Sequence, residues 1–166
     1  MMSLSGSFRL DNLLSELNAR GFMTQMLAPP QGVQELYGGN LSNIVLVGRP
    51  EVEGTYIAVP VTAEGETAVP LGALYAVSIR KLARLLAKIL KRLGFNVSES
   101  ELAENLKKSR YASGEVIIIV PTLDYLAELL QPYNIPNEKL ATILTLLLTE
   151  LMNELPIQAI GIPILP

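Results

Sequence analysis

The chain has 166 residues with 13 Lys and Arg side chains, 16 Asp and Glu side chains, and neither His nor Cys. Without Cys there are no disulfides and no thiolate nucleophiles, and without His the commonest general base and transition-metal ligand is missing. We therefore expect no cofactor. An enzyme without His and Cys would most plainly depend on carboxylates and a divalent metal. We assign no residue a catalytic or metal-binding role.

Hydrophobic residues make up 49% of the chain and charged residues 17%, against about 25% charged residues in a typical soluble protein. A chain of this length suits a single domain with a sizeable core. The excess apolar surface must either enlarge that core or meet another molecule, so we expect a homo-oligomer.

No stretch reaches the roughly 18 to 20 continuous apolar residues that a membrane-spanning helix needs. The first residues also lack the basic and apolar pattern of a secretory signal. We therefore expect no membrane span and a cytoplasmic location, or a place within a particle assembled there. Peripheral contact with a membrane remains open.

In the N-terminal half, leucines at helical spacing predict a helix over residues 8–20, and Gly21 follows as a stop signal. Residues 28–40 are rich in Pro and Gly and are interpreted as a loop. Strands are predicted over residues 43–48, 55–61 and 66–71. Pro60 and Pro70 flank the last turn, and because Pro donates no ladder hydrogen bond, the 55–71 hairpin should lie at a sheet edge or project.

In the C-terminal half, an amphipathic helix over residues 78–93 is followed by a helix that begins at Ser98 or Ser100 and ends near residue 108. Residues 115–120 predict a central strand, because β-branched residues fill both of its faces. A helix from Thr122 or Asp124 then ends before Pro132, and a last helix runs from about residue 136 to 155. The latter is apolar almost all round, which is typical of a core or an interface.

This order of elements predicts one α+β domain over residues 1–166, with a small mixed or antiparallel β-sheet of about four to five strands packed against about five helices. The apolar tail, residues 156–166, is expected to be extended. It docks either on its own subunit or, as an added strand, on a neighbour. The oligomer-contact residues predicted there are Ile157, Ile160, Ile162, Ile164 and Leu165.

The helix over residues 78–93 is the most informative feature. At about 100° per residue its basic side chains fall within an arc of roughly 120°, and leucines and isoleucines fill the opposite side. The basic residues are Arg80, Lys81, Arg84, Lys88, Lys91 and Arg92. The rest of the chain holds seven positive and sixteen negative charges, a net of −9.

A plain solvent-exposed face explains such a helix, but surface helices usually mix acids with bases and gain from i,i+4 pairs. Six like charges repel one another, and a partner would relieve the repulsion. Nucleic-acid phosphates, anionic lipid and an acidic surface of another subunit all fit. The acidic surface would be built from Glu99, Glu101 and Glu104, or from Glu150 and Glu154.

No aromatic residue lies within the basic set, so contact with DNA or RNA would be non-specific and made through phosphates. The leading hypothesis is a non-enzymatic, self-associating structural, assembly or scaffold protein whose basic helix contacts nucleic-acid phosphates or an acidic surface of a neighbouring subunit. A nucleoprotein or particle component is one example. The alternatives are a small regulatory or ligand-binding α+β module and, last, a carboxylate- and metal-dependent enzyme.

Overall fold

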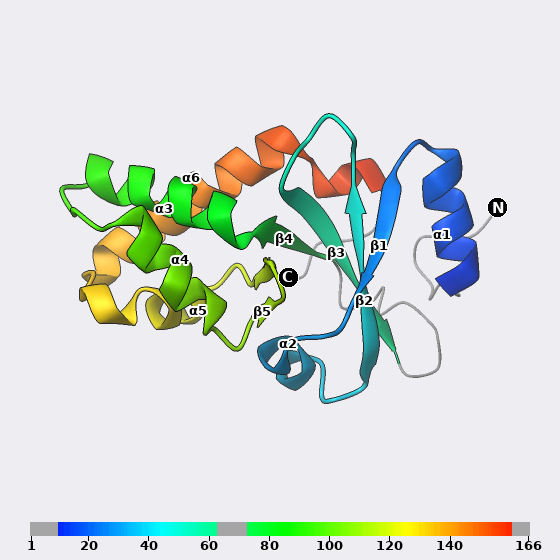
Figure 1. Ribbon diagram of the computed structural model, residues 1–166, viewed down its shortest axis with the longest axis horizontal. Coiled ribbons are helices and arrows are strands. Elements are labelled where there is room, and N and C mark those ends of the chain that lie inside the picture. The colour runs from blue at the N-terminus through cyan, green and yellow to red at the C-terminus, as the bar shows by residue number, and fades with distance from the viewer. Residues whose placement is uncertain (1–9, 63–72, 161–166) are drawn as a thin grey trace.

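The protein is α+β, as a computed structural model that describes residues 10–62 and 73–160 shows (Figure 1). Within these residues the strands are β1 (Met23–Leu27), β2 (Leu41–Gly48), β3 (Thr55–Thr62), β4 (Leu74–Ser78), β5 (Ala112–Ser113) and β6 (Val116–Ile119). They form one sheet in the order β1-β2-β3-β4-β6-β5. Every neighbouring pair is antiparallel.

The helices are α1 (Leu10–Ala19), α2 (Gln31–Leu36), α3 (Ile79–Arg92), α4 (Glu99–Lys107), α5 (Leu123–Leu129) and α6 (Asn137–Glu154), with 3-10 turns η2 (Gln131–Tyr133) and η3 (Ile157–Ile160). In Figure 1, α3, α4, α5 and α6 gather at one end of the molecule, and α1 lies beyond β1 at the other. The side chain of Arg20, just after α1, donates a hydrogen bond to the carbonyl of Ile160 at 3.3 Å.

The core lies along the middle strands. Residues 44–47 of β2 and 57–59 of β3 are buried at consecutive positions, so both faces of these strands are covered. A strand covered on both faces is a continuous apolar run, which is why the sequence predicts these two strands correctly. The apolar run at residues 116–119 also forms a strand, β6, as the sequence predicts. β6 is not in the centre of the sheet, because it is second from an edge and only the two-residue β5 lies outside it.

Four short elements are absent from the sequence prediction: the strands β1, β4 and β5 and the helix α2. The segment 28–40, interpreted as a loop, contains the six-residue helix α2, and β1 precedes it. Gly32 lies inside α2 because a Cβ atom there would be 2.6 Å from Cε1 of Tyr111. Glycine therefore marks a close approach of two segments here, where the sequence suggests a break in regular structure.

β3 lies between β2 and β4, yet β4 pairs only with residues 55–58 of it. Pro60 lies opposite Ile44 of β2, beyond the end of the β3–β4 ladder. At that position β3 is paired on one side only among the described residues, as a proline requires. The rest of the predicted hairpin, including Pro70 and the strand over 66–71, lies outside the described residues.

The last helix packs its inner side into the core through Leu140, Ile143, Leu147 and Leu151. Beyond it, residues 157–160 form the 3-10 turn η3, so the prediction that the tail is extended is wrong for this part. Ile157 and Ile160 are each 3% exposed. Burial within the chain favours docking of this part of the tail on its own subunit over a contact with a neighbour. Ile162, Ile164 and Leu165 lie outside the described residues.

Candidate anion-binding face

The helix α3 begins where its sequence predicts. The Ser78 hydroxyl accepts a hydrogen bond from the backbone N–H of Lys81 at 3.2 Å, which satisfies one of the donors that a helix start leaves free. Gly94, with φ of 93°, follows its last turn in a conformation that glycine adopts without strain. The apolar face is buried at Ile79, Leu82, Ala83, Leu86, Ile89 and Leu90.

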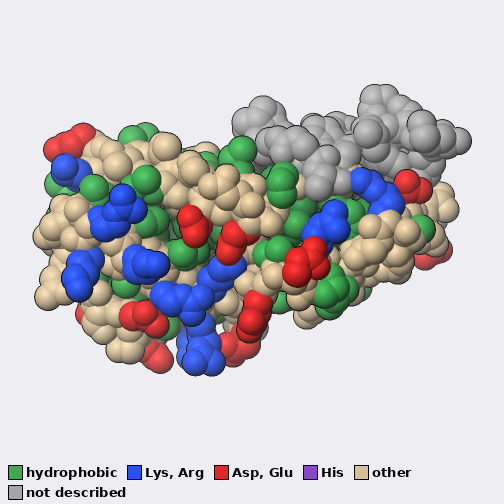
Figure 2. Space-filling model, turned by 90° about the horizontal axis from the view of Figure 1, so that it is seen from above, with side chains coloured by type: hydrophobic (Ala, Val, Ile, Leu, Met, Phe, Trp, Pro, Cys, Tyr) green, Lys and Arg blue, Asp and Glu red, His purple; other side chains and the backbone are tan. Residues whose placement is uncertain are grey.

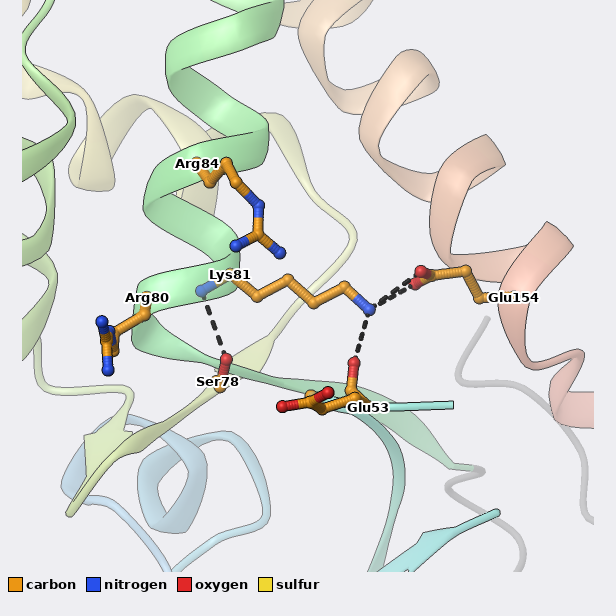
Figure 3. A pocket seen from close by; sticks show the side chains of 7 residues that line it. Glu53, Ser78, Arg80, Lys81, Arg84 and Glu154 are labelled. Atoms are coloured by element: carbon orange, nitrogen blue, oxygen red, sulfur yellow. Dashed lines mark hydrogen bonds and ion pairs between the residues drawn. The ribbon is translucent and has the colours of Figure 1, made fainter. Parts of the chain in front are cut away.

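Lys81 is the one member of the predicted basic set that is buried, with 8% of its surface exposed. Its ammonium donates to both carboxylate oxygens of Glu154, at 2.9 and 2.8 Å, and to the hydroxyl of Thr55 at 2.6 Å. The carbonyl of Glu53 accepts a further bond at 2.8 Å, as Figure 3 shows. Lys81 therefore joins α3, the start of β3 and the end of α6. Its charge is paired with that of Glu154 and is not available to bind another molecule.

An amine beside a hydroxyl can act as a base for a nucleophile, but this pair has the wrong surroundings. Thr55 is 0% exposed, so no substrate reaches its oxygen, and that hydroxyl itself donates to Glu154 at 2.8 Å. The Lys81 ammonium has its three protons engaged. The network is a structural connection between three elements, and it does not have the form of a catalytic site.

No local pattern in the sequence indicates this role. On the helical projection Lys81 lies inside the basic arc, between Lys88 and Arg92, both of which are exposed. Its acidic partner is 73 residues further along the chain. Only the packing of α6 against α3 identifies that partner.

The other five basic residues of the set, Arg80, Arg84, Lys88, Lys91 and Arg92, are all exposed, and together we call them the α3 basic face. Four of them recur every fourth residue, which places their Cα atoms about 6 Å apart along about 18 Å of helix. None of the five side chains forms an ion pair or a hydrogen bond with any residue of the ranges 10–62 and 73–160.

A cavity of about 600 Å³ opens beside the first turns of α3. It is lined by Glu53, Gly54, Ser78, Arg80, Lys81, Arg84 and Glu154. In Figure 3, Arg84 extends over the stem of Lys81, whereas Arg80 points to the other side. Because Lys81 and Glu154 neutralise each other, the charges left to the cavity are two arginines against one glutamate.

The surroundings of the face change along α3. Arg80 also borders a second cavity that Glu99, Glu104, Lys107 and Glu115 line, so carboxylates flank the start of the helix. Lys88, Lys91 and Arg92, further along the helix, form no ion pair with a carboxylate of the described residues. Figure 2 shows most of the Lys and Arg side chains visible from this direction on the left half of the molecule, with Asp and Glu side chains between them.

Arg110 forms a separate cluster with two carboxylates. Its guanidinium donates to Glu35 at 2.6 Å and to both oxygens of Glu128 at 2.9 and 3.0 Å. This hydrogen bonding lowers the pKa of Glu128 below its usual value. The cluster connects α2 to α5, and because its cation is already matched by two anions it is not a second anion site.

Within the described residues no group of three or more Asp and Glu side chains is placed to hold a metal ion. None of the described helices is long and apolar enough to cross a membrane. Comparisons with protein-family models, curated protein sequences and solved structures give no match. The α3 basic face is therefore the feature of the described chain that best indicates a function.

Proposed function

We propose that this protein is a non-enzymatic, self-associating assembly protein that binds nucleic-acid phosphates through the α3 basic face. The observation that supports this proposal is a single surface with five exposed cations and no ion pair to the described part of the chain. Like charges about 6 Å apart on one helix face repel one another, and an anionic partner removes that cost.

Duplex DNA suits the spacing of the face. It carries one charge for about every 1.7 Å of its axis, so a row of about 18 Å meets about ten phosphates and can pair each cation. The face contains no aromatic side chain on which a base could stack. Binding of this kind is independent of base sequence.

Anionic lipid fits the geometry less well. Basic amphipathic helices bind membranes by inserting their apolar face below the headgroups. In α3 that face is occupied by the core, because Ile79, Leu82, Leu86 and Leu90 are all 0% exposed. Only the exposed cations of α3 could then contact the headgroups of a membrane.

An acidic surface of a second subunit is the other candidate, and a specific observation favours it. Glu99, Glu101 and Glu104 are exposed on α4 and Glu150 is exposed on α6, whereas Glu154 is already paired with Lys81. A subunit contact through these residues would make the protein an assembly component without nucleic acid. The following experiment separates the two partners.

Binding to a short duplex is measured by fluorescence anisotropy across a salt series. Five phosphate contacts give a log–log slope of about −4.5, or a loss of about 500-fold in affinity from 50 to 200 mM salt. The variant Arg84→Gln/Lys88→Gln should reduce the slope to about −2.7. The control variant Lys108→Gln/Lys139→Gln also removes two positive charges, one at the C-terminal end of α4 and one on α6, and should keep the wild-type slope.

A slope near zero for the wild type contradicts the proposal, as does an equal loss in the control variant. If Arg84→Gln/Lys88→Gln instead leaves DNA binding absent or unchanged and lowers the molar mass in solution, the face contacts an acidic surface of another subunit.

A further inference from the structure

Among residues 10–62 and 73–160, the strand β1 forms one edge of the sheet and has no strand on its outer side. It is the first strand in the sheet order and pairs with β2 alone. Its outward backbone groups make no hydrogen bond to another part of the described chain. Three of its five side chains are also exposed, among them Met23 at 57% and Met26 at 42%.

Open edges are usually protected by a charge, a proline, a bulge or a very short strand. The opposite edge of this sheet follows that rule, because β5 has only two residues. β1 has five residues, Met-Thr-Gln-Met-Leu, without charge or proline, in unbroken register with β2. The contrast between the two edges indicates that β1 is kept available for pairing.

We propose that a second copy of this chain adds its β1 antiparallel to this β1, around a two-fold axis at Gln25. The inference rests on the self-association part of the proposed function and needs no nucleic acid. In this register Gln25 lies opposite itself, Met23 lies opposite Leu27 of the second copy, and Thr24 lies opposite Met26. An isologous contact of this kind requires a surface that is complementary to itself, and uncharged residues at all five positions meet that condition.

A pocket of about 300 Å³ next to β1 could receive a side chain from the β1 strand of a second copy. Its lining includes Met23 and Gln25 of β1, Gly48 of β2 and Tyr56 of β3. A Cβ at Gly48 would lie 3.1 Å from the Tyr56 ring, so glycine brings that ring close to the strand. Leu27 of the second copy, opposite Met23, lies on this same face of the sheet, at the pocket. Added strands commonly combine main-chain bonds with such a side-chain pocket.

The chain on either side of β1 limits the pairing. Pro29 and Pro30 follow Leu27 closely and cannot extend a ladder, and Gly21 with φ of 87° precedes the strand. Within the described ranges each copy has one such edge, and the pair uses it completely. The expected product is therefore a closed dimer and not a fibre.

The two-fold axis makes Gln25 a direct test. The wild-type mass, by sedimentation or light scattering, should rise from 18.0 kDa toward twice that value with concentration. Gln25→Lys alone and Gln25→Glu alone place like charges opposite each other and should each remain monomeric. An equimolar mixture of these two variants should recover the larger mass. A wild type that stays at 18.0 kDa, or dimers that neither variant weakens, would overturn the inference.

A second measurement uses the absence of Cys from the chain. Gln25→Cys puts two thiols opposite each other across the axis, where Cβ atoms lie about 4.5–5.5 Å apart, and mild oxidation should trap a covalent dimer. Met152→Cys, at a site that is 45% exposed on α6, is the matched control and should cross-link more slowly. Equal rates for the two variants contradict the proposed axis. Loss of DNA binding in the α3 variants leaves these results unchanged, so the two proposals fail separately.

Discussion

Replacing Lys81 with methionine tests the role assigned to this residue. The substitution keeps the buried stem and removes the ammonium, so Glu154, Thr55 and the Glu53 carbonyl all lose a donor. Breaking a fully buried ion pair from one side costs about 3 to 5 kcal/mol. The Glu154 side chain is 29% exposed and is partly solvated, so we expect Lys81→Met to lower the free energy of unfolding by about 2 to 3 kcal/mol.

Urea unfolding followed by circular dichroism measures this loss, with Lys88→Met as the control. Lys88 is exposed on the same helix, and its substitution should change the free energy of unfolding by less than about 0.5 kcal/mol. The double variant Lys81→Met/Glu154→Met should recover about 1 kcal/mol, because no unpaired carboxylate remains. If Lys81→Met costs no more than Lys88→Met, then Lys81 is not buried in this network and belongs with the exposed cations.

Two further substitutions test the packing of single residues. The Tyr37 hydroxyl is buried without a hydrogen-bond partner in the described chain, so Tyr37→Phe should raise the free energy of unfolding at pH 7 by about 1 kcal/mol, measured by urea unfolding. Burial also raises the pKa of Tyr37 to about 12 in the folded protein. The unfolded chain therefore ionises first as pH rises from about 10 to 12, so the wild type should lose stability over this range and the variant should lose less. A less stable variant contradicts this account. Gly32→Ala should cost about 1 to 3 kcal/mol in the same assay, since its Cβ would meet the Tyr111 ring at 2.6 Å; a gain of about 1 kcal/mol, as helix propensity alone predicts, would show that the approach is not tight.

The elements that the sequence predicts well are those with a strong local pattern. β2, β3 and β6 are runs of β-branched and apolar residues, and α3 combines a serine cap with complete separation of charge and leucine. Ser98 likewise caps α4, where its hydroxyl accepts from the backbone N–H of Glu101 at 3.3 Å. In each case the residues that decide the structure lie within one turn or one strand of each other.

The elements that the sequence does not predict depend on distant residues. β1 is exposed at three of five positions and shows no alternation, and α2 is short and contains a glycine that only Tyr111 explains. The candidate site shows the same limit. The basic arc is visible in the sequence. Lys81 does not belong to the exposed face, however, because it binds Thr55, 26 residues earlier, and Glu154.

Binding of phosphates by the exposed cations of α3 can be tested with a single measurement. The salt dependence of duplex DNA binding is compared between the wild type and a variant in which Arg80, Arg84, Lys88 and Arg92 are all replaced by glutamine. We expect a log–log slope of about −4.5 for the wild type and about −0.9 for the variant, in which only Lys91 of the α3 basic face remains. A variant that is folded by circular dichroism and keeps the wild-type slope would contradict it.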